Sequence, residues 1–258
     1  MKKLIIILCL SFIQASFSQY KNLNQAINDA GKQRMLSQKM AKSYLMIASD
    51  LQIDKYQAEL DQDMAMFAES LQKLTTYFKD NEAIQKEINK IDRFWLQFRE
   101  IASSQMYDKG RCNSIIRRAN LLLRATQDVV SSIAKKEKTK IGDIVNKSGS
   151  LRMLSQKLTM YYIASHLKLN SINITKITED FDKTSILLDQ RLTSLRSLKE
   201  INTEEINSKL KRAAADWSFI KRKLSMNNSS SPATIAVTLN NFMLQMDKIT
   251  SLYSKITS

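Results

Sequence analysis

The chain contains one helical segment twice, and this duplication limits its possible folds more than any other feature. Residues 34–39 and 152–157 share the sequence Arg-Met-Leu-Ser-Gln-Lys, and a Gly and an Asn precede both copies at the same spacing. An identical run of this length inside one chain indicates duplication, so the two halves should build the same structure. The functional question is therefore what two copies of one helix can do together.

The composition favours long helices over strands. The 258 residues include only 4 Gly and a single Pro, which argues against a turn-rich β protein. Apolar residues recur at intervals of three and four in four segments of each half, and the connections between these segments are short. That pattern is typical of a four-helix bundle. We predict an all-α fold in which two tandem four-helix bundles form an intramolecular pseudo-dimer.

The two predicted repeats cover residues 19–138 and 139–258. The sequence between them, residues 135–140, is highly charged and contains neither Pro nor Gly. Gly142 alone weakens the helical pattern there, and one interior glycine costs a helix roughly 1 kcal/mol relative to alanine. We therefore expect a long helix, continuous or kinked at Gly142, to join the halves.

The first 18 residues are typical of a signal peptide. Lys2 and Lys3 precede an apolar run over residues 4–12, and small residues near Ser18 suit cleavage. An uncleaved anchor is the alternative, but spanning a bilayer takes about 20 apolar residues and this run is shorter. Cys9 suggests a lipid anchor, although it lies early in the run. We expect a periplasmic or secreted product with no transmembrane segment in the mature chain.

The residue types argue against an enzyme, a cofactor and a metal site. Cys112 is the single cysteine after residue 18 and His166 is the only histidine, so the chain lacks a disulfide framework and a Ser/His/Asp or Cys/His set. Metal sites usually need clustered His, Cys, Asp or Glu, and the sequence has no such cluster.

The strong positive charge favours an anionic ligand or surface. The formal net charge is +15, and removal of Lys2 and Lys3 would leave +13. Nucleic acid, an anionic surface and a small anion all suit such a charge. Lysine and arginine are spread along the whole chain and no nucleic-acid-binding motif is present, so we expect no nucleic-acid partner.

One face of the repeated helix differs from the apolar face beside it. It is built of small and polar residues interrupted by one arginine, and its glycine allows another helix to approach closely. The face consists of Ile27, Gly31, Arg34 and Gln38 in the first copy and of Val145, Gly149, Arg152 and Gln156 in the second.

The natural partner of this face is the same face of the other copy. A pseudo-twofold contact would bring Arg34 close to Arg152. Two guanidinium groups about 6 Å apart repel by roughly 3 kcal/mol at an effective dielectric constant near 20. A small anion between them would replace this repulsion with two attractions, and arginine suits a planar oxyanion. We predict that Arg34 and Arg152 hold such an anion.

The segment Asn-x-x-Gly-x-x-Arg-Met-Leu-Ser-Gln resembles the P-box of bacterial nitrate/nitrite sensor kinases and of PilJ-type sensor domains. The resemblance implies a periplasmic four-helix bundle in which nitrate or nitrite lies between two P-box helices of a dimer, held by their arginines. On this chain the resemblance assigns ligand binding to Arg34, Arg152, Gly31 and Gly149, with Ile27 and Val145 one turn earlier. The best-known members carry one copy and dimerise, whereas this chain carries both, and we expect it to lack their transmembrane helices and signalling domains.

Less specific interpretations remain open for several of these residues. Each arginine alone could be a solvated surface residue, and Gln38 and Gln156 could either contact the anion or simply add polarity to the contact. Ser37 and Ser155 should bond to nearby backbone, and Lys39 and Lys157 should be solvated, as should Asp63. The alternative function is a ligand-free helical scaffold or partner-binding protein of the cell envelope.

Overall fold

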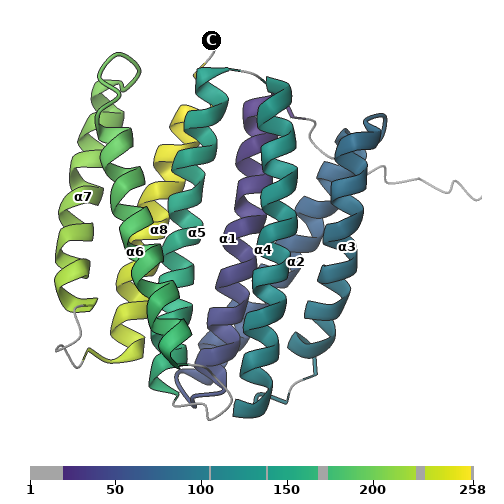
Figure 1. Ribbon diagram of the computed structural model, residues 1–258, viewed down its shortest axis with the longest axis vertical. Coiled ribbons are helices and arrows are strands. Elements are labelled where there is room, and N and C mark those ends of the chain that lie inside the picture. The colour runs from purple at the N-terminus through teal and green to yellow at the C-terminus, as the bar shows by residue number, and fades with distance from the viewer. Residues whose placement is uncertain (1–19, 105, 138, 168–173, 225–229, 257–258) are drawn as a thin grey trace, which may run out of the picture.

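Two four-helix bundles lie side by side in the computed structural model (Figure 1). It describes residues 20–104, 106–137, 139–167, 174–224 and 230–256, and the predicted signal peptide lies outside these ranges. The described residues form eight α-helices and no strand, which confirms the all-α fold class.

Each half of the chain supplies one bundle. The first consists of α1 (Leu23–Ile47), α2 (Ile53–Tyr77), α3 (Glu82–Ala102) and α4 (Lys109–Glu137). The second consists of α5 (Lys140–His166), α6 (Ile174–Arg196), α7 (Glu204–Leu224) and α8 (Pro232–Tyr253). In the first bundle α1 packs on α2 and α4, and α3 completes the ring; in the second, α5 packs on α6 and α8, and α7 completes it.

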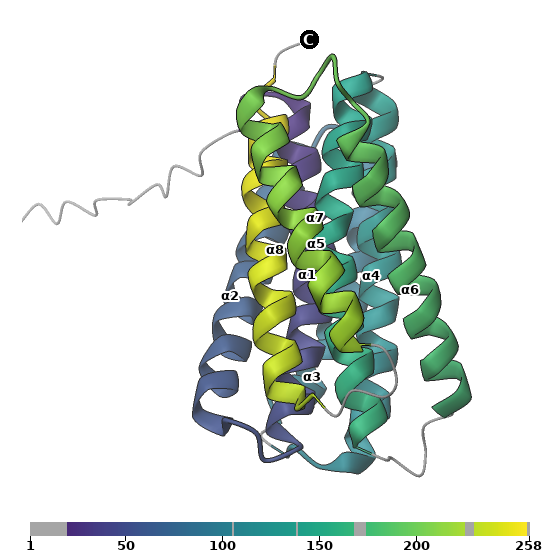
Figure 2. The same cartoon turned by 90° about the vertical axis from the view of Figure 1, so that its left-hand side faces the viewer.

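The bundles meet chiefly through α1 and α5, the two helices that carry the repeat. These helices run in the same direction through the centre of the molecule, and they remain central in the view turned by 90° (Figure 2). Both are buried almost all the way round, because one face packs into the helix's own bundle and the other against the second bundle. A polar face thus lies in the interior.

The prediction that one long helix joins the two halves is wrong. α4 ends at Glu137 and α5 begins at Lys140, so two antiparallel helices replace one long helix. Thr139 starts the second helix, because its side-chain oxygen accepts a hydrogen bond from the backbone N–H of Gly142 at 3.0 Å. The division of the chain into two independent domains near residue 138 stays a prediction.

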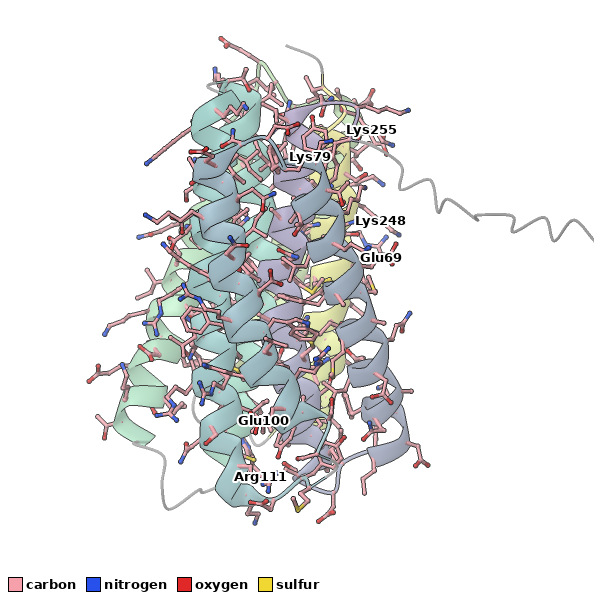
Figure 3. All side chains as sticks on the ribbon, turned by 90° about the vertical axis from the view of Figure 1, so that its right-hand side faces the viewer. Glu69, Lys79, Glu100, Arg111, Lys248 and Lys255 are labelled. Carbon is pink, nitrogen blue, oxygen red and sulfur yellow. The ribbon has the colours of Figure 1, made fainter. Side chains whose placement is uncertain are left out.

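Matching tryptophans mark the equivalence of the two bundles. Trp95 of α3 stacks on Phe67 with ring centroids 4.6 Å apart, and Trp217 of α7 lies 6.0 Å from the ring of Phe242. Both tryptophans are buried. Charged side chains cover the outside; Figure 3 labels lysines near one end of the molecule and Glu100 with Arg111 near the other.

Candidate functional site

The two repeat arginines lie together inside the protein, between α1 and α5. Arg34 is 1% exposed and Arg152 is fully buried. A Cβ atom placed on Gly31 would lie 3.1 Å from the Nη2 atom of Arg152 and 3.2 Å from that of Arg34. Both guanidinium groups therefore fill the space beside this glycine, and the two Nη2 atoms are no further apart than the sum of these distances.

Gly149 occupies the equivalent place on the other helix. A Cβ there would lie 3.0 Å from the Nη2 atom of Arg152 and 3.6 Å from that of Arg34. The arginine ends thus lie between the two glycines, where any larger side chain would crowd them. This close approach is the physical reason for glycine at both positions.

The arginines cross to the opposite helix in a reciprocal pattern. Nη2 of Arg34 donates to the backbone oxygen of Asn146 at 3.3 Å, and Nη2 of Arg152 donates to the backbone oxygen of Asn28 at 3.1 Å. Asn28 and Asn146 hold matching positions in the two repeat copies. The hydrogen bonds therefore follow the pseudo-twofold symmetry that the repeat predicts.

The pseudo-twofold symmetry does not extend to the hydrogen-bond acceptors of the two Nη1 atoms. Nη1 of Arg34 donates to Oε1 of Gln127 on α4 at 2.6 Å, whereas Nη1 of Arg152 donates to the carboxylate of Asp247 on α8. Gln127 and Asp247 thus occupy equivalent places with different charges. Arg34 also donates from Nη1 to Oδ1 of Asn146 at 2.8 Å. Among the described residues, one arginine is paired with the partly exposed carboxylate of Asp247 and the other donates only to amide groups.

This difference sets the electrostatics of the pair. The pKa of Arg34 is lowered to about 9, chiefly by burial and in addition by the nearby charges of Arg152 and Arg191. Burial also lowers the pKa of Arg152, while Asp247 acts in the opposite direction. Within the described part of the chain, no carboxylate is in salt-bridge contact with Arg34. The charge on Arg34 is therefore the less compensated of the two.

Several buried polar atoms along the same interface have no hydrogen-bond partner among the residues that the structure describes. They include Nε of Arg34, Oδ1 of Asn28, Oε1 of Gln38, and both side-chain polar atoms of Gln156. Native proteins provide hydrogen-bond partners for most buried polar groups. A cluster of unpaired polar atoms beside two buried cations therefore indicates an environment suited to a small polar ligand.

The structure brings most of the predicted site residues to this interface. Ile27 and Val145 are buried one turn before the glycines, and Gln38 donates to the backbone oxygen of Ala119 at 3.0 Å. Contact of any of them with a ligand stays a prediction. The interpretation of the arginines as solvated surface residues is wrong, because both are buried.

The serines behave as predicted. The hydroxyl of Ser37 donates to the backbone oxygen of Arg34, and that of Ser155 donates to the backbone oxygen of Arg152, each at 2.8 Å. The two hydroxyls thus bond within their own helices.

The predicted solvation of Lys39 and Asp63 is wrong. Nζ of Lys39 lies 2.8 Å from Asp63 and 3.1 Å from Glu59, and Asp63 is 2% exposed. Lys42 adds a second buried cation, 2.6 Å from Glu59. The first bundle therefore holds a cluster of two lysines and two carboxylates, in which Lys42 and Asp63 are buried and Lys39 and Glu59 are partly exposed.

The sequence reasoning assigned no role to four residues of the arginine site. Asn28 and Asn146 carried a usable signal, since they match between the copies at one spacing from the arginines. Gln127 and Asp247 carried none, because α4 and α8 lack an identical segment. The described residues also contain no group of His, Cys, Asp or Glu that could hold a metal ion. Among those same residues, no helix has the length and apolarity needed to span a membrane.

Comparison with known proteins finds one family. The family described as PilJ, type IV pili methyl-accepting chemotaxis transducer N-term, matches residues 15–111 and again residues 136–241. The two matches cover most of the chain and fall one on each half. No curated protein and no solved structure matches the chain.

Proposed function

This chain belongs to the PilJ family, and we propose that it is an exported sensor of a small monovalent oxyanion such as nitrate or nitrite. The family consists of sensory domains of chemotaxis transducers, which fits a signalling role without catalysis. In the proposal, the arginine pair binds the anion between α1 and α5, in the periplasm or outside the cell.

The observation that carries the proposal is the convergence of two buried guanidinium groups on Gly31 and Gly149. Like charges held this close in a buried site repel, and a negative ion between them would turn that repulsion into attraction. Nε of Arg34 is buried without a partner, so this side chain retains a donor for an additional acceptor.

The local charge supports a monovalent ion. The two guanidinium groups contribute two positive charges, and the carboxylate of Asp247 offsets one of them. Among these three groups one positive charge remains, which a single nitrate or nitrite would neutralise, and the nearby charges of Arg191 and Asp29 are opposite in sign. A divalent anion such as sulfate would leave a buried negative charge, which is costly.

We propose that the anion enters near Asn146. A hollow of about 520 Å³ lies between the end of α4 and the start of α5, lined by Ser131, Ala134, Lys135, Thr139, Lys140, Asp143 and Asn146. The side chain of Asn146, which lines this hollow, accepts a hydrogen bond from Arg34, so this residue connects the hollow to the arginine pair. Lys135 and Lys140 would attract an anion to it.

Binding would act on the contact between the bundles. In the proposed bound state the guanidinium groups exchange hydrogen bonds to Asn28, Asn146 or Gln127 for bonds to the anion. Because the bonds to Asn28 and Asn146 cross from one repeat helix to the other, their exchange would alter how α1 and α5 pack. That change is the signal available to a downstream envelope protein.

The test is isothermal titration with sodium nitrate and sodium nitrite into chloride-containing buffer. We expect saturable heats for the natural chain and none for Arg34→Ala or Arg152→Ala. Arg93→Gln, which removes an exposed arginine on α3, is the matched control and should bind normally. Equal heats for nitrate and chloride in the natural chain would overturn the proposal.

A second candidate function is a ligand-free scaffold that binds an envelope protein. One observation favours it: Asp247 and Asn28 already provide Arg152 with internal acceptors. Capture of a defined partner from envelope extract, with equal efficiency by the natural chain and by Arg34→Ala, together with absent nitrate heats, would support this alternative.

A further inference from the structure

A second basic hollow lies between the bundles, separate from the arginine pair. It has a volume of about 550 Å³, and its walls come from α4 of the first bundle and from α5 and α6 of the second. α5 runs between α4 and α6 in Figure 1, and all three helices contribute residues to the hollow. This volume is typical of sites for small organic molecules.

The charge of the hollow is strongly positive. Arg117 and Arg124 of α4, Lys157 of α5 and Lys176 of α6 line it, together with one carboxylate, Asp180. Asp180 lies 3.4 Å from Nζ of Lys176, so it is already engaged with that lysine. The remaining charge is three positive. Burial lowers the pKa of Lys157, and although Asp180 opposes this, Arg124 and Lys176 reinforce it.

The duplication provides an internal comparison for this site. Lys157 and Lys39 are the same residue of the repeated hexapeptide. Lys39 is neutralised by Asp63 and Glu59 at salt-bridge distance. Lys157 instead faces a hollow in which cations outnumber carboxylates. One copy thus carries its own counter-charges, and the other leaves room for an external one.

The hollow also offers apolar surface. Ile116, Tyr161 and Ile177 are buried residues in its lining, and Leu123 is half-buried there. A bare inorganic ion would leave the part of their surface that faces the hollow uncovered, whereas a ligand with an apolar body would cover it. We propose that this hollow binds a small organic anion that carries two acidic groups on an apolar or aromatic body.

Such a ligand would join the two bundles. Its acidic groups would contact Arg117 and Arg124 on the first bundle and Lys157 on the second, and its apolar body would lie on Tyr161 and Ile177. Binding would therefore stabilise the contact between bundles from a second position, independently of the arginine pair.

The test uses phthalate, a planar aromatic dianion, as the probe in isothermal titration. We expect saturable binding of phthalate and none of neutral benzamide at the same concentration. Arg117→Gln and Arg124→Gln should each weaken phthalate binding about tenfold, the usual effect of removing a hydrogen bond to a charged group. Asp180→Asn should tighten it, because the opposing negative charge is lost.

Arg212→Gln is the matched control, since it removes an exposed arginine on α7 outside the hollow. The inference is overturned if phthalate does not bind, if benzamide binds equally well, or if Arg124→Gln and Arg212→Gln bind phthalate alike. Nitrate titration of Arg124→Gln separates the two proposals, because the arginine pair is unchanged in this variant and should still respond to nitrate.

Discussion

The two copies of the hexapeptide occupy the same place in their bundles, yet their surroundings carry different charges. Arg34 meets the amides of Gln127 and Asn146, whereas Arg152 meets the carboxylate of Asp247. The backbone crossings and the glycine contacts are shared by both copies. The repeated helix thus fixes where each arginine lies, and the neighbouring helix fixes how far its charge is compensated.

The lysines of the same hexapeptide show the opposite imbalance. Lys39 in the first bundle is surrounded by carboxylates, and Lys157 in the second faces a hollow lined by other cations. In the first bundle, carboxylates therefore compensate the charge of the lysine but not that of the arginine. In the second bundle, a carboxylate compensates the arginine, and the lysine faces other cations. Identical motif residues can thus have different electrostatic roles when the helices around them diverge.

The largest expected difference concerns stability around the lysines. Asp63→Asn should lower the free energy of unfolding by about 3 kcal/mol, because it leaves buried Lys42 and partly buried Lys39 with only one carboxylate. The matched change Asp180→Asn should cost less than about 1 kcal/mol, since Lys176 is solvent-exposed. Urea denaturation of both variants measures the difference. Equal losses would show that the two lysine sites do not differ as described.

The second largest difference concerns how much each buried arginine destabilises the fold. Arg34→Met should raise the free energy of unfolding by about 1–2 kcal/mol, because a similar volume is kept while an uncompensated buried charge is removed. Arg152→Met should give a smaller gain or none, since it also removes the partner of Asp247. Thermal denaturation in nitrate-free buffer checks both. A larger gain from Arg152→Met would contradict the assigned charge balance.

Substitutions at Gln127 and Asp247, the side-chain partners of Arg34 and Arg152, should change nitrate affinity in opposite directions. Asp247→Gln makes the second arginine site resemble the first and should tighten nitrate binding about tenfold, because it removes a competing carboxylate. Gln127→Asp should weaken binding by a similar factor. Titration of each variant, and of the double variant that swaps the two residues, gives the comparison. Affinities that do not respond to either change would place the anion elsewhere.

The smallest effect on stability is expected at the glycines. Gly31→Ala gains about 1 kcal/mol in helix propensity, but its Cβ would crowd both Nη2 atoms, so the net change should be below about 1 kcal/mol. Nitrate binding should nevertheless be lost, because the guanidinium groups must move. Gly142→Ala near the start of α5 is the control and should leave binding intact. Normal nitrate binding by Gly31→Ala would argue against a ligand between the glycines.

Much of the fold follows from the sequence for simple reasons. Apolar periodicity and scarce glycine and proline predict eight helices, and the repeated hexapeptide predicts that α1 and α5 are equivalent. The break between α4 and α5 was missed, since Thr139 lies in a charged segment that is otherwise favourable to a helix. A single N-capping residue can decide such a boundary.

The site was only partly predictable. The glycines and arginines stand out because they recur, and the repulsion between the arginines follows from their pairing. Gln127 and Asp247 lie on helices distant in sequence, so only the packing of α4 on α1 and of α8 on α5 reveals them. Asp63 looked like a surface residue for the same reason, since its partners lie on another helix.

Placing both repeats on one chain has an evolutionary consequence. In an assembly of identical subunits, every substitution at the shared interface appears on both sides at once. Here a carboxylate can be gained at Asp247 while its counterpart remains the amide of Gln127. Covalent fusion has thus freed the two sides to specialise separately, and each can adjust its own charge without altering the other.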